Sequence, residues 1–145
     1  MQYKGGYLIG QIDKLTSRKV NELLKKEKVR DFNGAQGTIM YVLFDRKQMT
    51  IREIGKATGL AKTSLTSMLD RMEKQGLIEK RENPEDHRST LVELTEKARK
   101  QKNIIDKVST SVNQQYYKGM KEGEISRFEK MLTKVLQNME EDQGI

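Results

Sequence analysis

The sequence predicts a mainly α-helical protein with a small β-hairpin near its middle. Apolar residues recur at spacings of three and four along most of the chain, which is the period of an amphipathic helix. Two short helical segments meet at Gly59, and a segment of alternating residues follows them, interrupted by the chain's single proline, Pro84. Paired helices followed by a two-stranded hairpin form a winged helix-turn-helix. We therefore predict this fold, with further helices before and after it.

Composition narrows the functions that such a fold can have. Only 34% of the 145 residues are hydrophobic, so we expect one modest core supplemented by a long helix or by an interface with another subunit. The net charge of +7 favours polyanionic partners, although charge alone does not separate DNA from RNA or an anionic membrane surface. The absence of cysteine excludes disulfides and thiolate metal sites, and one histidine, His87, makes a metal site improbable.

Localisation and cofactors follow from the same composition. No apolar run is long enough to cross a membrane, and the first residues lack the basic and apolar segments of a secretion signal. We expect a cytoplasmic protein with no membrane contact, no metal and no cofactor.

The N-terminal third predicts two helices. The first runs from Tyr7 to about Val29 and carries a stripe of apolar residues. This stripe consists of Leu8, Ile12, Leu15, Val20, Leu23 and Leu24. Asn33 followed by Gln36 is typical of a capping box and begins the second helix, which ends before Asp45.

The central segment predicts the helix-turn-helix itself. Thr50 and Glu53 form a T-x-x-E capping box for a helix that ends near Thr58, and Gly59 suits the positive φ just past a helix end. A second helix, Lys62 to Gln75, has two distinct faces. The apolar face carries Leu65, Met68, Leu69 and Met72. The polar face carries Thr63, Thr66, Ser67, Asp70, Arg71 and Lys74.

The hairpin and two further helices complete the prediction. Strands are expected at Leu77–Arg81 and Leu91–Thr95, with a polar loop over Glu82–Thr90. Thr95 can cap a long helix, Gly119 and Gly123 predict a break, and a last helix follows. Its apolar residues are Ile125, Phe128, Leu132, Val135, Leu136 and Met139.

A resemblance to a known family rests on the hairpin. The segment Asp86–Thr95, D-H-R-S-T-L-V-E-L-T, fits the pattern D-x-R-x-x-x-V-x-L-T found in the wing of the MarR (multiple antibiotic resistance regulator) family. Gly59–Arg81 resembles the family's recognition helix and first wing strand, and the order of elements is similar over nearly the whole chain. One departure is Ala61, where the family commonly has Ser or Thr as the helix cap. Alanine cannot cap the helix, and the lost cap costs about 1 kcal/mol of helix stability.

Both the residue types and the resemblance predict a DNA-binding surface. An α-helix fits the major groove, where Arg71 can contact guanine, while Lys62 and Lys74 suit phosphates. The resemblance implies that Arg88 enters the minor groove, with Asp86 bracing the wing, and His87 is expected to be an exposed loop residue. The full predicted set is Asn33, Gln36, Lys62, Thr63, Thr66, Ser67, Arg71, Lys74 and Arg88.

The resemblance also implies a two-fold homodimer and a small-molecule effector. We expect residues 33–95 to form the DNA-binding lobe of a single unit and residues 1–30 and 96–145 to supply dimerisation helices. The interface candidates are Leu8, Ile12, Leu15, Phe128, Leu132, Val135 and Leu136. Aromatic acids or other lipophilic molecules are the effector class of the family. The residues that can line such a pocket are Tyr7, Lys14 and Tyr41, of which Tyr41 is equally compatible with the core.

Three classes of function compete for these features. The sequence predicts a DNA-binding transcriptional regulator that recognises a pseudo-palindromic operator in double-stranded DNA, in the role of a repressor. An enzyme is disfavoured, because no phosphate-binding glycine loop or pairing of a nucleophile with a base is visible. The remaining alternative is a winged-helix interaction or nucleoid module without sequence-specific regulation.

Overall fold

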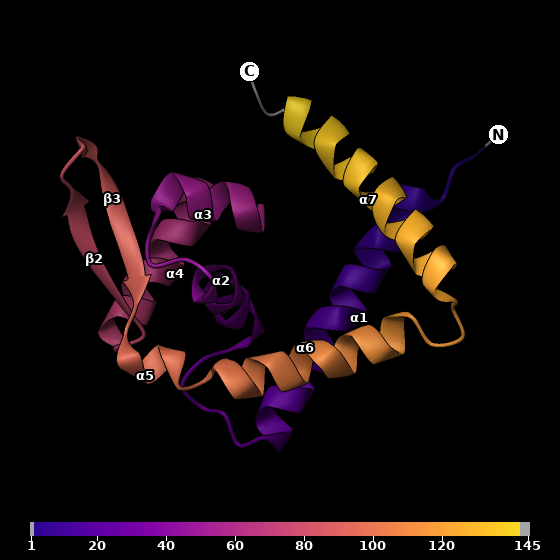
Figure 1. Ribbon diagram of the computed structural model, residues 1–145, viewed down its shortest axis with the longest axis horizontal. Helices are drawn as coiled ribbons and strands as arrows, with labels where there is room; N and C mark the ends of the chain where they lie inside the picture. Colours follow the sequence, from indigo (N-terminus) through magenta and orange to yellow (C-terminus); the bar gives the residue numbers. More distant parts are fainter. Residues whose placement is uncertain (1, 143–145) are drawn as a thin grey trace. The chain divides into compact units, whose positions relative to one another are not determined.

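The computed structural model describes residues 2–142 as a series of helices with one small sheet (Figure 1). In chain order the elements are α1 (Gly5–Lys26), α2 (Gly34–Phe44), β1 (Met49–Thr50), α3 (Ile51–Thr58), α4 (Lys62–Lys74), β2 (Ile78–Asn83), β3 (Asp86–Leu94), α5 (Glu96–Arg99), α6 (Lys102–Tyr116) and α7 (Glu122–Asp142). The predicted fold class, a mainly helical winged helix-turn-helix, is confirmed.

The chain forms two compact units, and each is described here by itself. One contains the residues up to Val112, and the other begins at Asn113. α1, α5 and most of α6 fall in the same unit as the winged lobe. Ile105 and Val108 of α6 are buried in the core of this unit. The division into a DNA-binding lobe and dimerisation helices stays a prediction.

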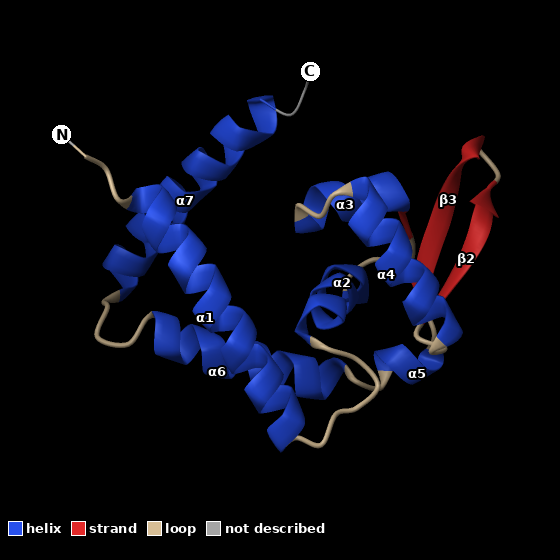
Figure 2. Cartoon of the chain, turned by 180° about the vertical axis from the view of Figure 1, so that it is seen from behind, coloured by secondary structure: helices blue, strands red, loops and turns tan. Residues whose placement is uncertain are grey.

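The sheet of the first unit is antiparallel and has three strands in the order β1-β3-β2. β2 and β3 form the wing, which Figure 2 shows as a hairpin beside the helices, with its turn at the end far from α5. The strands extend further than predicted, since Asn83 pairs with Asp86 and the loop expected over residues 82–90 is a tight turn around Pro84. Polar residues exposed on both faces of the outer wing hid these strand positions from an alternation argument.

The core of the first unit lies between α2, α3, α4 and the base of the sheet. Its fully buried side chains come from all of these elements. They are Ile39, Met40, Leu43, Ile54, Leu65, Leu69, Met72, Leu77, Ile78 and Val92. Leu65, Leu69 and Met72 confirm the predicted apolar face of α4, while Met68 is half-buried against the same core.

Side-chain caps define where several helices begin. Thr50 Oγ1 accepts the Glu53 backbone N–H at 3.1 Å, and Glu53 Oε1 accepts the Thr50 N–H at 2.9 Å, so the predicted capping box of α3 is present. These hydrogen bonds, first that from the Thr50 backbone, lower the pKa of Glu53. Thr95 caps a helix as predicted, but that helix is the short α5, which ends at Arg99 before α6 begins.

The second unit contains the end of α6 and all of α7. Gly119 adopts φ +80°, in the left-handed region that suits glycine, and forms part of the predicted break. Gly123, predicted as part of the same break, lies inside the first turn of α7. The Tyr117 ring packs edge-on against Phe128, and its hydroxyl donates to Glu129 Oε2 at 2.7 Å. These contacts fix the start of α7 against the end of α6.

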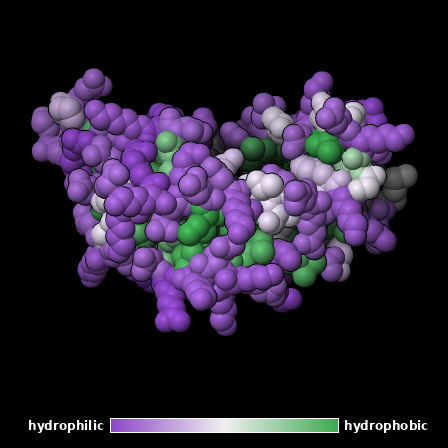
Figure 3. All heavy atoms as spheres, turned by 60° about the horizontal axis from the view of Figure 1, so that its bottom comes forward, coloured by the Kyte–Doolittle hydropathy of each residue, from purple (hydrophilic) through white to green (hydrophobic). Residues whose placement is uncertain are grey.

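Apolar side chains are also present on the surface. Most residues on the face seen in Figure 3 are hydrophilic, and hydrophobic residues interrupt them in separate patches. Among the described helices, none combines the length and apolar character needed to cross a membrane. Every residue of α7 from Glu122 to Glu141 is at least partly exposed. The apolar residues of α7 therefore have no core of their own in a single chain.

Candidate nucleic-acid interface

The helix-turn-helix is built from α3, a glycine turn and α4. Gly59 has φ +74°, and its N–H donates to the Gly55 carbonyl at 2.8 Å, which ends α3 as the sequence predicted. Leu65 buries its side chain under α3 and within van der Waals reach of Gly55. The turn and this contact set the direction in which α4 leaves α3.

α4 presents one continuous polar face to solvent. Each residue of the predicted contact set on this helix is exposed, namely Lys62, Thr63, Thr66, Ser67, Arg71 and Lys74. No ion-pair partner among residues 2–142 neutralises Lys62, Arg71 or Lys74, so their charges remain available for phosphates or base edges. Ala61 supplies no side-chain cap, which agrees with the departure noted in the sequence.

The wing tip presents an arginine on a braced turn. The Arg88 side chain is 95% exposed. Asp86 Oδ1 accepts the backbone N–H of Arg88 at 3.0 Å and lies 3.5 Å from its Nε. Asn83 supports the same turn, since its amide donates to Ser89 Oγ and its oxygen accepts the Glu85 N–H. His87 is exposed as expected, and its Nδ1 contacts a Glu82 carboxylate oxygen.

Ion pairs connect the wing to α4, and sequence reasoning missed them. Lys80 on β2 contacts Asp70 directly and lies 3.8 Å from Glu73 Oε1, while only 19% of its side chain is exposed. The neutralised Asp70 lies on the same polar face as Arg71. Strand alternation was the available signal, because Lys80 shares a side of β2 with the buried Ile78.

Gln36 is buried and does not have its predicted role as a DNA contact. Its side chain is 2% exposed and forms hydrogen bonds within the protein, so we remove it from the candidate DNA contacts. The capping signal was present as predicted, but a capping signal does not show whether its residues are buried. Asn33 is exposed and caps α2 through Oδ1, so it stays a candidate.

The dimer candidates are accessible in a single chain. Leu8, Ile12 and Leu15 on α1 are 48%, 45% and 56% exposed. On α7, Leu132, Val135 and Leu136 are 37%, 45% and 57% exposed, while Phe128 is half-buried.

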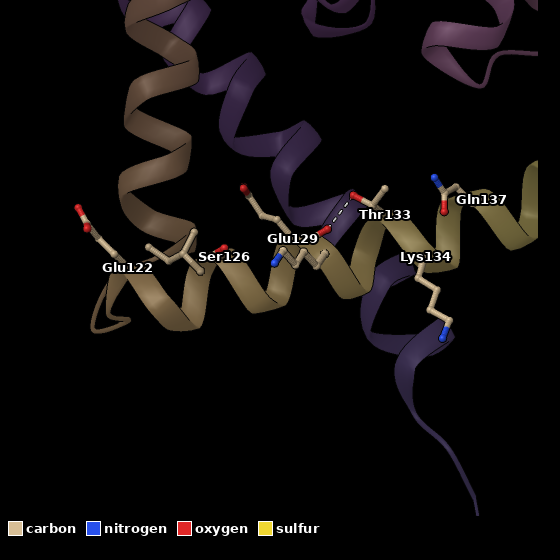
Figure 4. Close-up of a pocket in the computed structure, with 8 residues that line it drawn as sticks. Glu122, Ser126, Glu129, Thr133, Lys134 and Gln137 are labelled. Carbon is tan, nitrogen blue, oxygen red and sulfur yellow. Dashed lines mark hydrogen bonds between the residues drawn. The ribbon is translucent and has the colours of Figure 1, made fainter.

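The effector candidates are all exposed in a single chain. Tyr7 and Tyr41 are 69% and 53% exposed, so Tyr41 is not part of the core, and Lys14 is also exposed. One hollow among the described residues is lined by α7 residues alone (Figure 4). It is an open groove along one helix, and none of the three candidates lines it.

Comparisons with known proteins agree with this arrangement. The model of the MarR family matches residues 32–90. The HTH-type transcriptional repressor IacR of Pseudomonas putida is 25% identical over 134 residues, which cover 92% of this chain and 78% of IacR. The organic hydroperoxide resistance transcriptional regulator of Bacillus subtilis is 40% identical over 57 residues, and the chain spans only 39% of that relative's length.

A solved structure extends the likeness to nearly the whole chain. A mutant MarR from Escherichia coli complexed with operator DNA has a TM-score of 0.73 and 28% identity, covering 90% of this chain and 92% of that one. Together with the exposed face of α4 and the wing, these findings define a DNA-binding transcriptional regulator rather than an enzyme. The chain belongs to the MarR family.

Proposed function

We propose that the protein is a repressor that binds a pseudo-palindromic operator as a homodimer. In this proposal α4 enters the major groove of each half-site and Arg88 of each wing enters the adjacent minor groove. The two half-sites lie about 10 base pairs apart, as expected for a two-fold symmetric reader. The observation that carries the proposal is the two-sided character of α4, whose apolar face is buried while its polar face is exposed.

The chemistry of the α4 face supports recognition of base sequence. Short hydroxyl side chains at Thr63, Thr66 and Ser67 allow the helix backbone to approach the base edges closely. Arg71 is exposed without an ion-pair partner in the described chain, so it can donate two hydrogen bonds to guanine O6 and N7. Lys62 and Lys74 lie near opposite ends of the helix, where phosphates on both sides of the groove are in reach.

The wing supports a second contact. Asp86 fixes the backbone of the turn at Arg88, so the nearly fully exposed guanidinium extends from a fixed point. A narrow minor groove has an enhanced negative potential that favours an inserted arginine. Asp86 therefore acts as a positioning residue and does not itself approach the DNA.

The homodimer is supported by the apolar surface of α1 and α7. The first half of α1 exposes Leu8, Ile12 and Leu15, whereas Leu24, near the end of the same helix, is buried. On α7 the exposed apolar residues recur at helical spacing from Leu132 to Met139. Pairing of these surfaces with those of a second chain removes them from water and presents two copies of α4.

An effector is the second part of the proposal. A small aromatic or lipophilic acid that binds beside Tyr7, Lys14 and Tyr41 would favour one separation of the two lobes over another. If that separation does not match the half-sites, operator affinity falls. The exposure of both tyrosines supports an accessible site, which the partner chain helps to enclose.

The test selects bound duplexes from a random library and compares the selected site with a random duplex of equal length. We expect the selected site to be a palindrome that two chains occupy, bound about 1,000-fold or more tightly than random DNA. Equal affinity for both duplexes at every salt concentration would overturn the proposal. That result would instead support the alternative, a winged-helix or nucleoid module that binds DNA without regard to sequence.

A further inference from the structure

A buried polar side chain connects the start of α2 to the end of α4. Gln36 is the one buried polar residue among those the structure describes, and its side-chain oxygen and nitrogen both have partners inside the protein. Its Oε1 accepts the Asn33 backbone N–H at 3.0 Å, and its Nε2 donates to Gln75 Oε1 at 3.1 Å. Because an unpaired polar group is costly inside a protein, this hydrogen bond favours one arrangement of Gln36 relative to Gln75.

The end of α4 is fixed from a second side as well. Lys97 Nζ donates to the Gln75 carbonyl at 2.9 Å, and Thr95 Oγ1 donates to the Gly76 carbonyl at 2.6 Å. The opposite end of α4 has no side-chain cap at Ala61. The helix has 13 residues and is about 20 Å long, so its C-terminal attachments, together with the turn that joins it to α3, set where its N-terminal end lies.

The same turn of α2 is attached to α1. Asn21 Oδ1 accepts the Gly34 N–H at 2.9 Å. A Cβ at position 34 would lie 3.0 Å from Val20 Cγ1, so glycine allows α2 to begin directly against α1. Asn33, Gly34 and Gln36 thus form one turn with α1 on one side and the end of α4 on the other.

We propose that this turn is a rigid connector that fixes the recognition helix α4 relative to α1, with Gln36 as its positioning residue. The inference rests on the proposed function, in which α1 carries part of the dimer interface. Since the partner chain fixes α1, the connector fixes each α4 relative to the other. The Gln36–Gln75 hydrogen bond then determines which half-site spacing the dimer accepts.

The test breaks the Gln36–Gln75 hydrogen bond without removing the α2 cap. Gln75→Met has a similar volume but no acceptor, and Gln75→Glu restores an acceptor for Gln36 Nε2. Gln48→Met is the matched control, because Gln48 is an exposed residue outside the connector. Each dimer is titrated with the selected operator and with operators whose half-sites are one base pair closer or further apart, and its mass and unfolding temperature are measured.

We expect the parent protein and Gln48→Met to prefer the selected spacing by about tenfold or more, since one base pair displaces and rotates a half-site. Gln75→Met should lose most of this preference at a temperature where it stays folded and dimeric, and Gln75→Glu should regain it. An unchanged preference of Gln75→Met for the selected spacing would overturn the connector proposal. An equal loss of affinity for all three duplexes would overturn it as well, because it leaves the preference unchanged.

Two further outcomes concern a variant that does not fold and a parent protein that does not select the operator. If Gln75→Met does not fold, Lys97→Met removes the second attachment of the same helix end, and a retained spacing preference in that variant overturns the proposal. If the parent itself does not distinguish the operator from random DNA, the proposed function fails, which is a separate result from failure of the connector.

Discussion

Arg71→Ala separates recognition of DNA sequence from stability of the fold. Arg71 is exposed on α4 and has no ion-pair partner among the described residues, and alanine is the best helix former. The free energy of unfolding should therefore change by no more than about 1 kcal/mol, mainly through the lost interaction with the helix dipole. A bidentate contact to guanine contributes about 1–3 kcal/mol of discrimination at each half-site.

The symmetric operator doubles this effect. Loss of both guanine contacts costs roughly 2–6 kcal/mol, and since 1.4 kcal/mol is tenfold, we expect operator affinity to fall by roughly 30-fold to 20,000-fold. Fluorescence anisotropy with the selected operator and with duplexes substituted at each position measures both affinity and discrimination. Discrimination should relax at one base position in each half-site and remain at the others.

A matched control removes the same charge elsewhere. Arg127→Ala changes an exposed arginine on α7, outside the winged lobe, so it corrects for the general electrostatic attraction of the protein to DNA. We expect this variant to lose little affinity and no discrimination. If Arg71→Ala binds the operator and its substituted forms as the parent does, the assignment of Arg71 to base contact is wrong.

Three further predictions concern the wing, the dimer and the second unit. Arg88→Ala should weaken operator binding without change in helicity by circular dichroism, because its side chain is 95% exposed, and parent-like binding would contradict the minor-groove role. Leu136→Lys should yield monomers in sedimentation, since a charge replaces a 57% exposed apolar residue of α7, and an unchanged mass would exclude this surface as the interface. The hydrogen bond to Glu129 raises the pKa of Tyr117 above its ordinary value. Its stabilising effect is therefore complete well below the ordinary pKa of tyrosine and is lost as the pH rises through the higher folded pKa, so tyrosinate absorbance should show a late titration that Glu129→Gln shifts earlier.

The sequence predicted the elements that depend on signals within one segment, such as helical spacing and helix caps. The spacing of Leu65, Leu69 and Met72 predicted the buried face of α4, because only a helix places those positions on one side. Thr50 and Gly59 predicted the ends of α3, since capping depends on neighbouring backbone groups alone. Such local signals do not require knowledge of the tertiary structure.

Features that depend on tertiary contacts were missed or wrong. β1 has two residues, Met49 and Thr50, and exists only because β3 pairs with it. Gln36 carries the sequence signature of a cap, but its burial depends on the end of α4, which lies 39 residues later. The contact between Lys80 and Asp70 likewise joins a strand to a helix across the wing. No periodicity within one segment contains that information.

The exposed state of α7 has a consequence for how the protein responds to its own abundance. From Glu122 to Glu141 no side chain of the helix is fully buried, although most of the stability of helices in proteins comes from packing of an apolar face. On the proposed function, this helix becomes firmly ordered when a second chain covers it, so folding of the C-terminal unit and assembly are one equilibrium. At low occupancy, operator binding would then rise with the square of the concentration of free chains, which gives a steeper than linear response to dosage without any ligand.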